Sequence, residues 1–298
     1  MGSMATPQKA STRFGPRTRR LALIVGFGAL AFVLTAVVGG IWSALLTVNL
    51  ATSPAIPWAV AVMALLLWLM WRYLGGAGWP RSTAEARRRR LRARRTPRRV
   101  FLSAVGAGVL AIVALAGLWF VLFQLAHLSP TRALPGYSTY PLITVALVLV
   151  MASLVGAITE EAAFRGYFQG ALEGTVGGVG AILITALVMA PEHALTQGFV
   201  WPTLLFYAIV DVMLGATAFL AQSILPGIVT HAIGLLAFFT LVWPADVIRQ
   251  VAGHGTTELW FWIHVAQTLV FAGLAILAFI HLASIQRLAS AQRRTTSE

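Results

Sequence analysis

Long apolar runs constrain the fold of this chain more than any other feature of its sequence. A helix needs about 20 apolar residues to cross about 30 Å of hydrocarbon, and the sequence holds about eight runs that meet this requirement. We expect spans at residues 21–48, 56–75, 101–127, 140–160, 180–199, 202–222, 225–243 and 258–284. Strands are not expected, because the runs are long and do not alternate with a period of two residues. The sequence therefore predicts an all-α membrane protein, a bundle of about eight transmembrane helices.

The composition agrees with a lipid-solvated chain. Hydrophobic residues make up 58% of the 298 positions and charged residues only 10%. A soluble domain needs more charge to cover its surface, so lipid must be the solvent for most of this chain. Cysteine is absent, which excludes disulfide bonds, a thiol nucleophile and thiolate metal ligands.

The basic residues are clustered beside the apolar runs, and this clustering predicts the orientation. Basic segments that flank spans stay on the cytoplasmic side, and an even number of crossings also places both termini on one face. We expect a multi-pass protein of the cell membrane with both termini cytoplasmic. Its expected parts are a basic tail at 1–20, two spans within 21–80, an Arg-rich cytoplasmic linker at 81–99, a transmembrane bundle at 100–284 and a C-terminal tail at 285–298.

The net charge of +13 would also suit a nucleic-acid-binding protein. The Arg-rich linker, however, has no interleaved aromatic residues on which bases could stack. We therefore expect no nucleic-acid partner, and anionic lipid headgroups as the partner of this linker.

Ionisable residues inside the expected spans are the main indication of function. Such groups are costly in hydrocarbon, so they face the interior of a bundle and have partners. Within a short stretch the sequence places seven of them in or against spans, namely Glu160, Glu161, Arg165, Glu192, His193, Asp211 and His231.

The two adjacent glutamates are expected to have different roles. Neighbouring side chains on an α-helix point about 100° apart, and Arg165 lies four residues after Glu161, on the same face. We expect Glu161 and Arg165 to form a structural ion pair. Glu160 then has no local counter-charge and is a candidate for proton transfer. A purely structural ion network of all three residues is the alternative.

Two histidines are expected to approach Glu160. The glycines at 174–178 break the helix, and the resulting hairpin brings His193 to the same depth as Glu160. His231 follows shortly after Pro226, where the seventh span is expected to begin. We therefore expect Glu160, His193 and His231 to meet in the cytoplasmic half of the bundle.

Three short motifs in this region resemble those of the CPBP group of intramembrane proteases, which includes type II CAAX prenyl endopeptidases and Abi proteins. The resemblance covers about residues 140–240. The EExxxR motif is intact, FxxxH carries Met for Phe, and HxxxN or HxxxD carries Leu235 at its polar position. The matching stretches are Glu160-Glu161-Ala-Ala-Phe-Arg165, Met189-Ala-Pro-Glu-His193 and His231-Ala-Ile-Gly-Leu235.

The resemblance implies hydrolysis of a peptide bond in a membrane-embedded or lipidated peptide or protein. The roles of the family's motif residues, transferred to the matching positions, imply that Glu160 and His193 activate a water molecule and that His231 stabilises the oxyanion. Leu235 cannot donate a hydrogen bond, and the loss of one such donor costs about a hundredfold or more in rate. Asp211 and Gln222 are candidates for a substitute polar group.

Alternatives to a metal-free protease remain open at this point. One carboxylate and two histidines are also a catalytic zinc ligand set, so Glu160, His193 and His231 are candidate zinc ligands. We expect no cofactor, because no single helix carries HExxH spacing. A catalytically silent membrane scaffold of the same fold is the main rival function. A proton-coupled transporter also uses buried carboxyl and imidazole groups, but the sequence lacks the repeated halves common among transporters.

Overall fold

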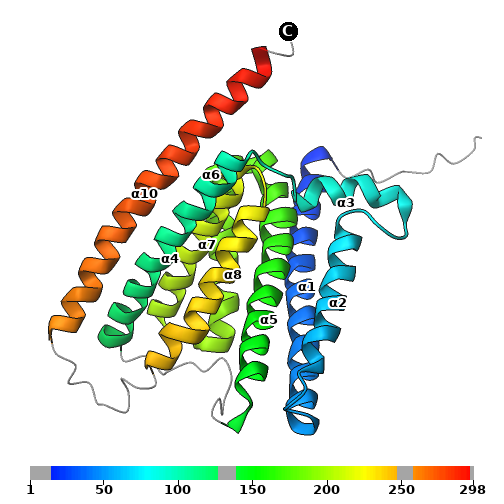
Figure 1. Cartoon of the computed structure of the whole chain (residues 1–298). Coiled ribbons are helices and arrows are strands. Elements are labelled where there is room, and N and C mark those ends of the chain that lie inside the picture. Colours follow the sequence, from blue (N-terminus) through cyan, green and yellow to red (C-terminus); the bar gives the residue numbers. More distant parts are fainter. Residues whose placement is uncertain (1–14, 127–138, 247–257, 296–298) are drawn as a thin grey trace, which may run out of the picture.

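The computed structural model describes residues 15–126, 139–246 and 258–295. All regular elements in these ranges are helices, and no described residue lies in a strand. The helices pack side by side into a bundle (Figure 1). The expected all-α class is confirmed. Most of the expected N-terminal tail and the last three residues of the C-terminal tail lie outside the described residues.

The elements follow the expected spans closely. In chain order they are α1 (Pro16–Thr52), α2 (Trp58–Leu74), η1 (Arg81–Thr83), α3 (Ala84–Leu91), α4 (Arg98–Ala126), α5 (Leu142–Glu160), η3 (Glu161–Phe168), α6 (Gln169–Gln197), α7 (Trp201–Ala221), α8 (Leu225–Ala237), η4 (Phe238–Val242) and α10 (Glu258–Thr295).

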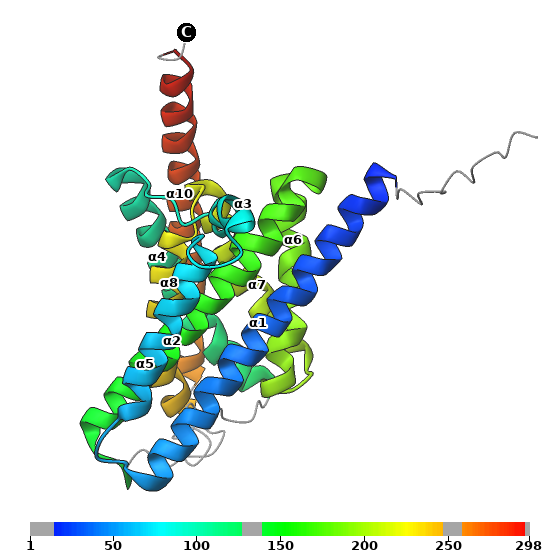
Figure 2. The ribbon, with the colours of Figure 1, turned by 90° about the vertical axis from the view of Figure 1, so that its right-hand side faces the viewer.

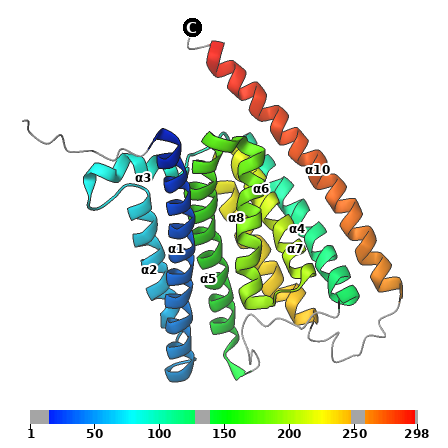
Figure 3. The same cartoon turned by 180° about the vertical axis from the view of Figure 1, so that it is seen from behind.

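Six described segments are long and apolar enough to cross a membrane, and α2, with 17 residues, is a shorter apolar helix. One segment, Leu142–Ala194, has 53 residues, far more than the roughly 20 that one crossing requires. Its backbone breaks at Gly177, where φ is 77° and ψ is 171°, a conformation that glycine adopts without steric cost. The chain reverses direction there (Figure 3), inside the expected glycine turn. The total number of crossings and the cytoplasmic placement of the termini stay predictions.

Two apolar clusters hold much of the bundle together. One joins α5 to α1 and α2, and the other joins α4 to α7, η4 and α10. Many large apolar side chains on the outer faces are exposed, among them Leu183 and Leu187. Burial of one face and exposure of an apolar outer face is the pattern that a lipid-solvated helix requires.

The long α10 lies along α4 at the edge of the bundle (Figures 1 and 2). Gly117 of α4 permits this close approach, because a Cβ atom there would lie 2.7 Å from Oγ1 of Thr268. Gln267 of α10 donates a hydrogen bond of 2.8 Å to the carbonyl oxygen of Val113. Polar contacts of this kind stabilise helix pairs in membranes, where no hydrophobic driving force operates.

The Arg-rich linker is docked on the end of the bundle and contains the helix α3. Leu91 is only 2% exposed, and Arg87 donates a 3.0 Å hydrogen bond to the carbonyl oxygen of Ala77. After α3, Ser223 donates a 2.7 Å hydrogen bond to the carbonyl oxygen of Arg94. These contacts hold the linker against the end of α2 and the connection between α7 and α8.

Candidate active site

The helix that carries the two glutamates changes form at this point. The α-helix α5 ends at Glu160, and the π-helix η3 spans Glu161–Phe168 with all eight residues buried. The α-helical geometry expected for this segment is therefore wrong from Glu161 onward. A π-helix has wider turns than an α-helix and occurs frequently at functional sites.

Glu161, Arg165 and Asp211 form a buried ion network. Nη1 of Arg165 lies 3.6 Å from Oε1 of Glu161, and Nη2 of Arg165 donates a hydrogen bond to Oδ1 of Asp211 in α7. All three side chains are at most 1% exposed. The structure thus contains the expected pair of Glu161 and Arg165. It adds Asp211 as a second acidic partner, which balances a guanidinium that would be costly to bury alone.

Glu160 faces both histidines. Its Oε2 atom lies 3.9 Å from Nε2 of His193 and 3.8 Å from Nε2 of His231. Both distances exceed those of a direct hydrogen bond. Oε2 is buried and has no hydrogen-bond partner among the residues that the structure describes. The structure therefore brings the three expected residues together, from α5, α6 and α8.

Glu161 also orients the ring of His231. Nδ1 of His231 lies 3.2 Å from Oε1 of Glu161, so Nδ1–H donates to this carboxylate. The other ring nitrogen, Nε2, is then directed toward Glu160. Sequence reasoning assigned Glu161 to Arg165 alone and missed this contact. A carboxylate that holds one nitrogen of a histidine fixes the orientation of the ring and the role of the other nitrogen.

His193 rests against an aromatic ring that sequence reasoning did not select. Its imidazole stacks on the phenol ring of Tyr207 in α7, with centroids 4.2 Å apart and planes 20° apart. No motif in the sequence marks Tyr207. Because a stacked ring cannot rotate freely, Tyr207 limits the positions that His193 can adopt.

Two glycines allow the close packing around the glutamates. A Cβ atom at Gly227 would lie 2.6 Å from Oε2 of Glu161, and one at Gly156 would lie 2.8 Å from Cδ1 of Leu235. Neither glycine has a positive φ. Both positions require a residue without a side chain. This requirement comes from tertiary contacts and could not be predicted from the sequence.

A cavity of about 150 Å³ adjoins Glu160, His193 and His231. Its wall is mainly aliphatic and aromatic, with Ile112, Leu115, Phe206, Val210, Met213, Leu214, Leu235, Phe238, Phe239 and Trp243 among its residues. Leu235 contributes an apolar surface where the resemblance implies a polar side chain.

The two candidates for a substitute polar group are placed very differently. Asp211 lines the cavity, but its Oδ1 atom accepts a hydrogen bond from Arg165. Gln222 ends α7 in a left-handed conformation, is exposed, and donates a hydrogen bond to the carbonyl oxygen of Phe219. Gln222 does not line the cavity, because its position at the C-terminus of α7 directs it away. The expectation that Gln222 could supply the substitute polar group is therefore wrong.

The donor atoms do not fit a metal site as they are placed. Zinc holds nitrogen and oxygen ligands at about 2.0–2.2 Å. Within residues 15–126, 139–246 and 258–295, no group of three or more His, Asp or Glu residues is arranged to hold a metal ion.

Comparison with known proteins identifies the region that contains this site. The family model of the Rce1-like type II CAAX prenyl endopeptidases matches residues 141–236. This segment is therefore similar to the Rce1-like endopeptidases, and the match supports the expected resemblance to CPBP intramembrane proteases. The matched region contains Glu160, Glu161, Arg165, His193 and His231, and so includes the whole candidate site. No curated protein and no solved structure matches the chain.

Proposed function

We propose that this protein is an intramembrane endopeptidase in which Glu160 activates a water molecule with the help of two histidines. The match of residues 141–236 to the Rce1-like family model supports the reaction class. One observation carries the mechanism: a buried carboxylate oxygen of Glu160, without a hydrogen-bond partner among the described residues, faces the Nε2 atoms of His193 and His231.

The separation of these atoms suits a shared water molecule. Oε2 of Glu160 and Nε2 of His193 are 3.9 Å apart. A water oxygen placed off the line between them reaches both at ordinary hydrogen-bond length. Glu160 then takes a proton from this water while the water oxygen attacks the carbonyl carbon of the scissile peptide bond.

His231 is the proposed donor to the oxyanion that forms in this step. Its Nδ1–H is held by Glu161, so an imidazolium form directs Nε2–H into the space beside Glu160. Donors aimed at the developing oxyanion stabilise the transition state more than the ground state. Glu160 next passes its proton to the departing amide nitrogen. The C–N bond breaks, and a carboxylic acid and an amine are released.

The wall of the cavity suggests the class of substrate. Aromatic and aliphatic side chains from α4, α7, α8 and η4 surround a volume of about 150 Å³, which suits an apolar side chain next to the scissile bond. We therefore propose a membrane-embedded or lipidated peptide or protein as the substrate, cleaved by a CAAX-type endopeptidase in the cell membrane.

The test uses the purified full-length chain in lipid vesicles and a quenched fluorescent peptide with an apolar segment. We expect Glu160→Gln to lower kcat by at least about a hundredfold, since general base catalysis contributes factors of that size. Glu85→Gln is the matched control, because Glu85 is an exposed carboxylate on α3, away from the site. Equal cleavage by wild type and Glu160→Gln would contradict the proposal.

A catalytically silent scaffold is the second candidate, and Leu235 is the observation that favours it. Leu235 packs close to Gly156, and its Cδ1 atom stands 2.8 Å from the position of a Cβ there. The polar position of the third motif is thus filled by an apolar contact. A scaffold would show no cleavage above background in the assay above while still folding normally.

A further inference from the structure

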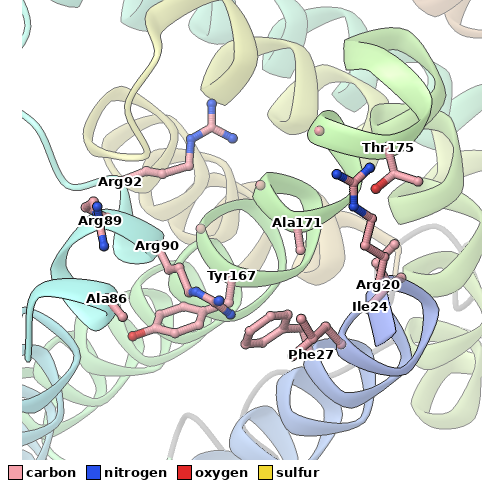
Figure 4. A pocket seen from close by; sticks show the side chains of 14 residues that line it. Arg20, Ile24, Phe27, Ala86, Arg89, Arg90, Arg92, Tyr167, Ala171 and Thr175 are labelled. Atoms are coloured by element: carbon pink, nitrogen blue, oxygen red, sulfur yellow. The ribbon is translucent and has the colours of Figure 1, made fainter. Parts of the chain in front are cut away.

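A second and larger cavity lies between α1, α3 and the start of α6. Its volume is about 520 Å³. It shares no lining residue with the cavity beside Glu160, so the catalytic proposal does not account for it. Figure 4 shows Arg20 on one side of this space and Arg89, Arg90 and Arg92 on the other, with Ala171 between them.

Four arginines line this cavity, and two of them form ion pairs with glutamates. Nη1 of Arg92 lies 2.7 Å from Oε1 of Glu173, and Nη1 of Arg89 lies 3.5 Å from Oε1 of the exposed Glu85. Arg20 and Arg90 form no ion pair with any described carboxylate. The cavity therefore carries an excess of positive charge and suits an anion.

The position of Arg90 is fixed by its neighbours. Its guanidinium lies over the ring of Phe27, with Cζ 4.1 Å from the ring centroid. A guanidinium stacked in this way keeps its edge donors available for a phosphate. The backbone of α3 also approaches η3 closely, since a Cβ at Gly166 would lie 3.0 Å from the carbonyl oxygen of Leu91. This packing makes the basic wall a fixed part of the fold.

Most of the remaining lining is apolar, and among its residues only Tyr167 and Thr175 carry a hydroxyl group. Leu23, Ile24 and Phe27 form the wall on α1, and Gly170, Ala171 and Gly174 form the floor. A Cβ atom at Gly174 would meet nothing within 4 Å, so the floor is open at this point. A free phosphate ion is not stabilised by contact with an apolar surface, whereas a hydrocarbon chain is.

The order of residues along α1 matches the boundary of a membrane. Arg20 stands at the start of the apolar segment Arg20–Thr52, and Leu23, Ile24 and Phe27 follow within two turns. Basic groups at this depth meet lipid phosphates, and apolar side chains below them meet acyl chains.

We propose that this cavity binds an anionic phospholipid. Its phosphate contacts Arg20 and Arg90, and one acyl chain lies along Leu23, Ile24 and Phe27. This assignment concerns one defined cavity, and it differs from the general attraction of a basic segment to an anionic surface.

The test measures binding to the purified full-length chain in detergent. Fluorescent phosphatidylglycerol is titrated against wild type, the double variant R20Q/R90Q and the control double variant R88Q/R99Q. The control removes the same charge from two exposed arginines of the Arg-rich linker that do not line the cavity. We expect the dissociation constant to rise about tenfold or more in R20Q/R90Q, because this variant loses two charge-assisted contacts to the phosphate, and to stay close to wild type in the control, whose arginines make no such contact.

A third variant tests the volume without any change of charge. Gly174→Leu places a side chain in the open floor, and leucine is favoured over glycine within helices. We expect this variant to keep the unfolding midpoint of the wild type in the absence of lipid and to lose the stabilisation by phosphatidylglycerol. It also covers the case in which R20Q/R90Q fails to fold.

Three results would overturn the proposal. Equal losses in the two double variants would indicate diffuse attraction to the whole basic segment. Equal stabilisation of the wild type by inorganic phosphate and by phosphatidylglycerol would indicate a phosphate site without a lipid chain. Full stabilisation of Gly174→Leu by phosphatidylglycerol would place the lipid elsewhere. Every readout is a binding or unfolding measurement, so the outcome is independent of proteolytic activity.

Discussion

Oε2 of Glu161 lies against the backbone of Gly227, so close that a Cβ atom on this glycine would come within 2.6 Å of it. The same carboxylate contacts Arg165 and holds Nδ1 of His231 through its other oxygen. Glycine at the first turn of α8 is therefore a condition for the position of Glu161, and through Glu161 for the ring of His231.

Gly227→Ala tests this relationship directly. The added methyl group must displace Glu161, and overpacking of this kind costs about 1–3 kcal/mol. We expect a lower unfolding midpoint together with a loss of cleavage activity. Gly39→Ala is the matched control, because a Cβ at Gly39 meets nothing within 4 Å. Unchanged stability and activity in Gly227→Ala would show that Glu161 does not depend on this contact.

Arg165→Met is expected to destabilise the protein strongly. The change leaves the buried carboxylates of Glu161 and Asp211 without their shared cation, and removal of one partner from a buried ion pair costs about 3–5 kcal/mol. The unfolding midpoint measures the loss. We expect the triple variant with Glu161→Gln and Asp211→Asn to recover much of the stability, since no uncompensated charge remains. No recovery would mean that Arg165 acts mainly through packing.

Leu235→Asn is expected to raise the rate of peptide cleavage. An amide at this position adds a donor beside the proposed oxyanion, and one such donor is worth about a hundredfold or more in favourable geometry. Leu235→Ala is the control, because it removes the contact with Gly156 without adding a donor. The comparison uses kcat for both variants. Equal rates for the two would indicate that this position does not face the reacting atoms.

Tyr207 is expected to act as a positioning residue for His193. Tyr207→Phe keeps the stacked ring, whereas Tyr207→Leu removes it. We expect the leucine variant to lower kcat about tenfold or more, because misplaced catalytic groups lose rates of this size, with a smaller change in KM. We expect Tyr207→Phe to retain most of the wild-type kcat. A loss of the same size in both variants would assign the effect to the hydroxyl group instead.

Metal chelation provides a test of the cofactor. We expect 1,10-phenanthroline to leave cleavage unchanged, since the described His, Asp and Glu residues include no group arranged as a metal site. Loss of activity that added zinc restores would instead assign Glu160, His193 and His231 as zinc ligands, with a bound water as the nucleophile. Metal content of the purified protein serves as the second measurement.

The sequence alone determined the class of fold and the approximate place of the site. Run length fixed the helices, because a segment in hydrocarbon must satisfy its own backbone hydrogen bonds. The glycine turn at Gly177 and the start of α8 beside Pro226 could also be predicted from the sequence, since both follow from local backbone preferences. The cost of placing charge in hydrocarbon also indicated Glu160, His193 and His231 as candidate site residues.

Only the tertiary structure decided how these groups are held. The double role of Glu161, the stacking of Tyr207 on His193 and the need for glycine at Gly227 depend on contacts between residues far apart in the chain. The π-helical form of η3 and the exposed position of Gln222 also could not be predicted from the sequence. The physical reason is that periodicity and composition report the surroundings of one helix at a time. Side-chain contacts between helices depend on how those helices rotate and approach one another when they pack.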